Sequence, residues 1–157
     1  MGGRLDFEVV PLVGVGPVRL GMTRDEARAA IGVAVTPFAK VPDAVWRTDA
    51  FHGAAFQVFY SGDRPIVDFI ELSAGSGVEA VLSGLTVFAT PADEVIAQVS
   101  ARSPFDANDR ELGFSYVFPQ LELAFWRPVI PESPDDPDGR CFATVGIGAP
   151  GYFSRLG

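Results

Sequence analysis

Few side chains in this sequence could carry nucleophilic or acid–base chemistry. His52 is the single histidine and Cys141 the single cysteine, so a catalytic triad or a Cys–His pair would have to use them. No nucleophile-elbow motif is present, and Cys141 begins an apolar segment in which a thiol packs as a small hydrophobic group. The sequence therefore predicts a protein that is not an enzyme.

An acidic segment at 135–139 has the composition of a calcium-binding loop. An EF-hand needs acidic residues at alternating positions and a closing glutamate, and only Asp136 and Asp138 have the alternate spacing. The sequence therefore predicts no metal site and no cofactor. Together with Glu132, Asp135 and its neighbours are expected to form either a solvated loop or a docking loop that attracts a basic protein.

Two other patterns have ordinary structural explanations. The glycines around Gly14 and Gly16 lack the lysine that a phosphate-binding loop requires, so they predict a turn before a helix. Asp68 and Glu71 are odd-spaced in one predicted strand, so they point to opposite faces and make a poor acid–base pair.

Aromatic side chains are the residue type that most often anchors protein interfaces. Phe125 and Trp126 are adjacent in a predicted strand, so one is expected in the core and the other on the outer side. Loops or helices could cover that outer side. An exposed Trp126 would make a docking patch beside the acidic segment, and either Trp126 or Tyr116 would anchor a partner.

The composition indicates one globular domain. The chain has 157 residues, 48% of them hydrophobic, which is enough to build a core without disulfides. Its formal net charge of -8 argues against nucleic acid as a partner. No apolar run is long enough to cross a membrane and no signal core follows Arg4, so we expect a cytoplasmic protein without a membrane partner.

Two short helices are predicted to begin at threonines. Thr23 and Glu26 form a capping box, and the apolar spacing extends the first helix over 23–31. Thr90 has the character of an N-cap, with Pro91 at the first helical position. The second helix would bury an apolar face made of Ala92, Val95, Ile96 and Val99.

Alternating apolar residues predict several strands. The clearest signal is a hairpin of 54–60 and 66–73 with a Ser-Gly-Asp turn between them. Residues 7–20 are apolar but broken by Gly and Pro, which favours an extended edge strand with a turn. The remaining strands are predicted at 114–118, 121–127 and 141–147, with a proline-rich loop at 128–140.

The two helix starts lie in similar surroundings, 67 residues apart. Each has an apolar approach, a threonine and an acidic residue three positions later, followed by alternating strands. We therefore expect a single domain, 1–157, made of two tandem halves at about 7–75 and 84–150. The predicted fold class is α+β: two helix-plus-antiparallel-sheet repeats, with the helices packed on one side of a curved sheet. A single α/β sandwich without repeats is the alternative.

The segment from Gly14 to Gly32, with Gly21-Met22-Thr23 at its helix start, resembles the motif of the BamE/SmpA/OmlA group. In that group the motif opens a helix before a small antiparallel sheet, and the beta-lactamase inhibitor protein contains a similar unit twice. The sequence departs from the group at Ala27, where the family has valine, and in lacking a signal peptide, a lipobox cysteine and a disulfide pair. The resemblance implies the fold and a tendency to bind other proteins.

The leading hypothesis is a non-enzymatic inhibitory module, a cytoplasmic immunity protein that occludes the active site of a basic toxin. The predicted partner-binding residues are Trp126, Tyr116, Glu132, Asp135, Asp136 and Asp138. The alternative is a small-molecule binder or an enzyme that uses a cleft between the halves, around His52, Arg47 or Arg127. An assembly factor, as the envelope family implies, is a third hypothesis.

Overall fold

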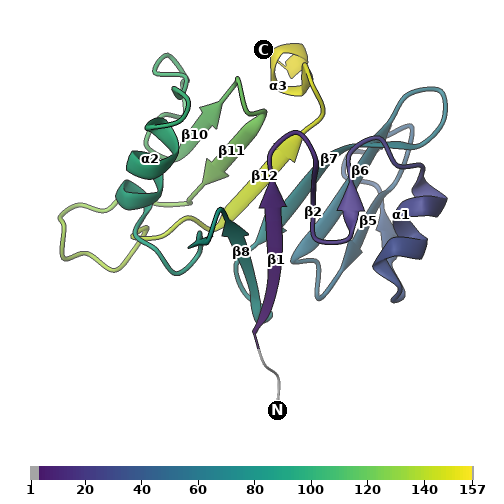
Figure 1. Cartoon of the computed structure of the whole chain (residues 1–157), viewed down its shortest axis with the longest axis horizontal. Coiled ribbons are helices and arrows are strands. Elements are labelled where there is room, and N and C mark those ends of the chain that lie inside the picture. The colour runs from purple at the N-terminus through teal and green to yellow at the C-terminus, as the bar shows by residue number, and fades with distance from the viewer. Residues whose placement is uncertain (1–3, 157) are drawn as a thin grey trace.

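The computed structural model describes residues 4–156, and its largest element is a seven-stranded antiparallel sheet (Figure 1). The strand order is β10-β11-β12-β7-β6-β5-β4. The strands are β4 (Thr36–Phe38), β5 (Thr48–Phe51), β6 (Phe56–Ser61), β7 (Ile66–Ser73), β10 (Ser115–Phe118), β11 (Leu123–Trp126) and β12 (Thr144–Gly148). The two predicted halves, 7–75 and 84–150, therefore meet along the hydrogen-bonded β7–β12 pair. That they are repeats of one another stays a prediction.

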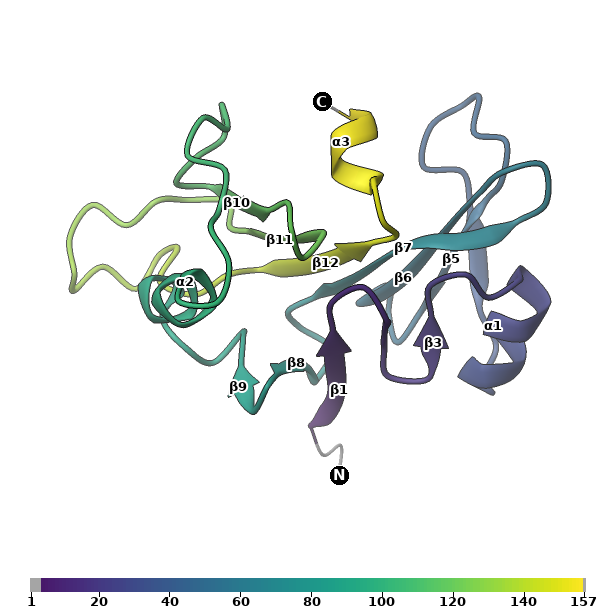
Figure 2. The ribbon, with the colours of Figure 1, turned by 45° about the horizontal axis from the view of Figure 1, so that its top comes forward.

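A second, five-stranded sheet covers one face of the first (Figure 2). Its order is β3-β2-β1-β8-β9, and β1 and β8 pair in parallel. The strands are β1 (Leu5–Val10), β2 (Gly14–Val15), β3 (Val18–Arg19), β8 (Val78–Leu82) and β9 (Leu85–Thr86). Val9, Val15 and Val18 from this sheet share one hydrophobic core with Phe56 and Ile147 of the large sheet.

The predicted fold class is wrong, because the protein is mostly β and the helices do not form the layer that covers the sheet. The helices are α1 (Arg24–Ile31), α2 (Ala92–Ser100) and α3 (Tyr152–Leu156). Only Ala27 of α1 is buried, whereas α2 buries Ala92, Val95 and Val99. Helices α1 and α2 lie at the margins of the second sheet (Figure 2), and that sheet supplies most of the covering layer.

The second sheet was not predicted from the sequence, because its central pair of strands, β1 and β8, comes from distant parts of the chain. Leu5 pairs with Val78 and Glu8 with Val81, so the two strands are far apart in the chain. A parallel pair of this kind leaves no hairpin turn in the sequence. Its other strands, β2, β3 and β9, are two residues each, too short for a periodic signal.

The predicted hairpin is confirmed as β6 and β7, in which Val58 pairs with Ile70. The pairing shifts between Phe59 and Tyr60, where a bulge interrupts the register. Because of this irregularity, Val67 joins the core on the same side as Ile70, although strict alternation had put them on opposite faces. The predicted strands at 114–118, 121–127 and 141–147 are confirmed as β10, β11 and β12.

The two threonines behave differently at the helix starts. The Thr23 hydroxyl accepts the Glu26 N–H at 3.1 Å, and the Glu26 carboxylate accepts the Thr23 N–H at 3.0 Å, which confirms the capping box. The prediction that Thr90 caps the second helix is wrong. Pro91 is the N-cap residue of α2 and makes no side-chain cap hydrogen bond, while the Thr90 hydroxyl lies 3.4 Å from that of Thr86.

This difference makes a matched pair of substitutions informative. Thr23→Ala is expected to lower the free energy of unfolding by about 1 kcal/mol, because it removes a side-chain cap. Thr90→Ala is the control and should cost clearly less, because it caps no backbone N–H. Urea unfolding of both variants measures the two costs. Equal losses would contradict the assignment of the cap to Thr23 alone.

A buried carboxylate ties α1 to the large sheet. Asp49 on β5 is fully buried, and its two oxygens accept hydrogen bonds from the Arg28 guanidinium at 2.8 Å each. The Tyr60 hydroxyl donates a third at 2.6 Å. Burial, together with this hydrogen bond to Asp49, raises the pKa of Tyr60, so the phenol stays protonated. The three side chains join α1, β5 and β6, with Asp49 and Tyr60 buried and Arg28 partly exposed.

Candidate protein-docking face

The face of the large sheet that points away from the second sheet is the candidate site, and we call it the open face. Val58, Ile70 and Ile147 are fully buried on the inner side, so alternate residues of the same strands point outward. Helices α1 and α2 lie on the side of the second sheet (Figure 2), so neither covers this face. The residues of the open face include Gln57, Phe59, Phe69, Glu71, Ser73, Thr144, Gly146, Ala124 and Trp126.

Backbone pairing aligns one row of residues across the centre of the open face. Gln57, Glu71, Gly146 and Ala124 are neighbours on β6, β7, β12 and β11. A Cβ at Gly146 would collide with the ring of Phe69, so this ring lies against the glycine backbone. The row therefore combines two polar side chains with two short residues, between the larger Phe69 and Trp126.

Aromatic rings occupy one end of the open face. Phe69 packs edge-on against Phe59 with the ring centroids 5.4 Å apart, and Tyr152 stacks on Phe69 at 4.6 Å. Tyr152 belongs to α3, which follows β12. The Glu122 carboxylate fixes the start of this helix by accepting the N–H groups of Gly151 and Phe153, both at 2.9 Å. These rings form a fixed apolar border.

Glu71 is a partly buried carboxylate in the middle of this surface. Burial raises the pKa of Glu71, and the positive charge of Lys40 opposes this effect. Among the side chains that the structure describes, those of residues 4–154, no cation lies within 4.0 Å of the Glu71 carboxylate and no side-chain hydrogen bond to it is formed. The Lys40 ammonium instead lies 4.5 Å from the ring centroid of Phe59. Glu71 is therefore partly buried and has no direct partner for its charge among the described side chains.

Glu71→Gln is expected to stabilise the protein at neutral pH but not at about pH 4. Burial raises the pKa of the Glu71 carboxyl in the folded chain above its value in the unfolded chain. In the pH interval between these two pKa values, the folded state therefore binds more protons than the unfolded state. Stability therefore falls as pH rises through this interval, and glutamine removes that fall. Urea unfolding at the two pH values measures it, with the exposed Glu111→Gln as control. A loss of stability at neutral pH would contradict this account.

Trp126 lies on the open face near the end of β11, and 43% of it is exposed. Its neighbour Phe125 is fully buried and stacks on Phe142 with the centroids 5.1 Å apart. The prediction that these adjacent aromatics face opposite sides is therefore confirmed. Trp126 pairs across the sheet with Ser115 and Thr144, whose side chains are small.

Tyr116, the other predicted anchor, lies on the opposite side of the sheet. It pairs with Phe125 and so points inward, where its ring packs edge-on against Phe105 at 5.2 Å and Phe142 at 5.9 Å. The structure therefore separates Tyr116 from Trp126. Tyr116 contributes to the core border and not to the surface that carries Trp126.

The acidic loop at 128–140 begins directly after Trp126 and is held by a buried arginine. Arg127 is 4% exposed, and its guanidinium donates to the carbonyls of Gly113 at 2.8 Å and Gly139 at 2.9 Å. Within the loop, Asp136 accepts the N–H groups of Asp138 at 2.9 Å and Glu132 at 3.1 Å. These bonds lower the pKa of Asp136. The four predicted acidic residues are therefore brought together, with Glu132, Asp135 and Asp138 exposed.

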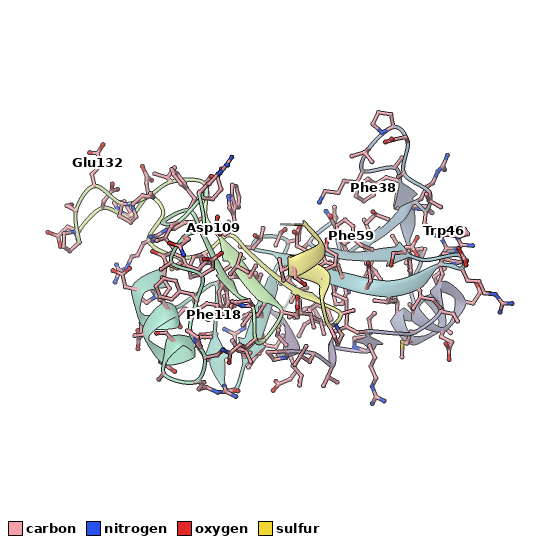
Figure 3. The ribbon with its side chains drawn as sticks, turned by 90° about the horizontal axis from the view of Figure 1, so that it is seen from above. Phe38, Trp46, Phe59, Asp109, Phe118 and Glu132 are labelled. Carbon is pink, nitrogen blue, oxygen red and sulfur yellow. The ribbon has the colours of Figure 1, made fainter. Side chains whose placement is uncertain are left out.

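A second acidic segment at 106–111 was missed by sequence reasoning. The sequence signal for it is the cluster of carboxylates at Asp106, Asp109 and Glu111. In the structure, Asp106 and Asp109 each accept the backbone N–H two residues ahead at 2.9 Å, and Glu111 is exposed. Arg127 binds the carbonyl of Gly113, two residues after this segment, and that of Gly139 in the first loop. Figure 3 labels Asp109 and Glu132 toward one end of the molecule, with Phe38 toward the other.

The residues proposed for catalysis do not converge. His52 has φ of 52° and packs its ring against Phe51 at 5.0 Å and Phe7 at 5.6 Å, whereas Arg127 holds the acidic loop. Arg47 is exposed on the connection between β4 and β5. In the part of the chain that the structure describes, no group of three or more His, Cys, Asp or Glu side chains is arranged to hold a metal ion. No helix there is long and apolar enough to span a membrane.

Comparison with models of protein families, with curated proteins and with solved structures finds no match to this chain. The resemblance of the Gly21-Met22-Thr23 helix start to the BamE/SmpA/OmlA group and to the beta-lactamase inhibitor protein therefore stays a prediction.

Proposed function

We propose that this chain is a non-enzymatic protein-binding module that holds a basic partner protein on its open face. The observation that carries the proposal is Trp126, a large aromatic side chain 43% exposed beside an ordered acidic loop. Tryptophan in such a position is the residue type that most often dominates binding energy in protein interfaces.

Further exposed apolar side chains lie on the connections at the two ends of the large sheet. Val129 and Ile130 follow Trp126 in the chain and are 43% and 41% exposed. Val41 and Val45, on the connection between β4 and β5, are 50% and 82% exposed. Binding surfaces of proteins combine an apolar and aromatic centre with a charged rim, and the acidic loops supply such a rim here.

The charge of the rim defines the class of partner. Glu132, Asp135 and Asp138 are exposed, and Asp136 is kept ionised by two backbone N–H groups. A cluster of one sign steers the approach of a partner of the opposite sign and raises the rate of association. A protein with a basic surface is therefore the expected partner.

In its most specific form, the proposal is an immunity protein that occludes the active site of a basic toxin in the cytoplasm. The inhibition would be steric and electrostatic and would need no catalytic group of this chain. The enzymatic alternative gains no support, because the junction of the halves is the paired strands β7 and β12, while Arg127 and His52 make structural contacts.

The test is capture of the partner from a lysate of the organism that encodes the chain, at low salt, followed by kinetics with the purified partner. A loop variant with Glu132→Gln, Asp135→Asn and Asp138→Asn should associate about tenfold more slowly at low salt. Asp136 is left intact because it orders the loop.

A control variant of the same net charge carries Glu8→Gln, Asp63→Asn and Glu94→Gln, three exposed positions outside the two acidic segments. It should associate at nearly the wild-type rate. A loop variant that associates as fast as wild type, or wild-type association that does not slow as salt rises, would contradict the role given to the loop.

A further inference from the structure

The centre of the open face has an electrostatic feature that the acidic rim does not explain. Glu71 lies in the row with Gln57, Gly146 and Ala124, so its lateral neighbours are one neutral polar side chain and short residues. These neighbours offer no cation. Carboxylates that lose water usually gain a charged or hydrogen-bonding partner, because desolvation without one is costly.

The aromatic rings near Glu71 also favour a bound cation. Phe59 lies on the neighbouring strand on one side and the half-exposed Trp126 lies two strands away on the other, and aromatic faces attract cations. Lys40 already uses this property, with its ammonium 4.5 Å from the Phe59 ring centroid. Lys40 is exposed, and it is the charged group that acts on Glu71 in the folded chain.

From this geometry we infer that Glu71 is the recognition site for an arginine side chain of the partner, which docks beside the central row on the side of Trp126. The inference rests on the proposed function and names the chemistry that the open face selects. Arginine fits best because its planar guanidinium can donate two parallel hydrogen bonds to one carboxylate and stack on aromatic rings. A docked arginine would satisfy the Glu71 charge that Lys40 leaves without a direct contact.

The test uses Nα-acetyl-arginine methylamide as the probe and needs no partner protein. The probe is titrated into the full chain while NMR follows the side-chain carboxyl carbon of Glu71 and the backbone amide of Gly146. The expected result is a saturating shift of both signals. The citrulline analogue, which has the same shape without the charge, should give no saturating shift.

Two variants make the result specific. The Glu71→Gln variant should bind the arginine probe at least about tenfold more weakly, because a charge-assisted hydrogen bond is lost. The shift of the Gly146 amide signal reports this affinity. Glu111→Gln, an exposed carboxylate in the other acidic segment, should leave it unchanged. Unmoved Glu71 signals, equal shifts with citrulline, or shifts confined to the acidic loop would each overturn the inference.

Failure of this inference can be told apart from failure of the proposed function. If the probe does not act on Glu71 but the loop variant still slows association with the partner, only the arginine site is refuted. If the loop variant associates normally, the proposed function loses its support whether or not the probe binds.

Discussion

Replacing Asp49 by alanine is expected to lower the free energy of unfolding by at least about 3 kcal/mol, because the buried Tyr60 hydroxyl loses its acceptor and the partly exposed Arg28 loses its charge-assisted hydrogen bonds. Asp49 is fully buried and accepts two hydrogen bonds from Arg28 and one from Tyr60. Its loss would strand the Tyr60 hydroxyl in the core and release α1 from the sheet.

Chemical unfolding of Asp49→Ala beside two controls measures this effect. Tyr60→Phe removes one hydrogen bond and keeps the ion pair, so it should cost only about 1–3 kcal/mol. Asp43→Ala changes an exposed carboxylate and should be nearly neutral. If Asp49→Ala were no more destabilising than Asp43→Ala, the buried triad would not hold α1 in the way described.

Trp126→Ala is expected to weaken binding of the partner by at least about 2 kcal/mol, or roughly thirtyfold in Kd. The exposed part of the side chain would lose its contact with the partner. The stability of the free chain should change much less, because 43% of Trp126 is already exposed and the core of β11 is formed by Phe125.

Equilibrium binding of the purified partner to the variant and to Val10→Ala gives the comparison. Val10 is a similarly exposed apolar residue, at 42%, but lies on β1 in the second sheet. Only the Trp126 variant should lose affinity. Equal affinity of wild type and Trp126→Ala would remove the anchor from the proposed interface.

Local signals in the sequence predicted the elements that form locally. The β6–β7 hairpin follows from alternation and a turn between its strands, and α1 from the capping box at Thr23. The second sheet depends on pairing between Leu5–Val10 and Val78–Leu82, for which no local pattern exists. The fold class was therefore wrong at the layer that long-range pairing creates.

The candidate site shows the same division. The acidic loop and the opposite sides taken by Phe125 and Trp126 follow from composition and from strand alternation. The central place of Glu71 needs cross-strand register, which aligns it with Gly146, and the clamp that Arg127 makes to Gly139 needs the folded loop. Tyr116 was misplaced because its side of the sheet follows from pairing with Phe125.

Blocking one face of the large sheet tests the central claim most directly. In a Cys141→Ser background, Ser73→Cys introduces a thiol beside Glu71 and Thr144 on the open face, and Glu8→Cys introduces one on the second sheet. Each protein is coupled to a poly(ethylene glycol) maleimide and used to capture the partner. The account predicts that the label at position 73 abolishes capture and the label at position 8 does not. Full capture by the protein labelled at 73 would contradict docking on the open face.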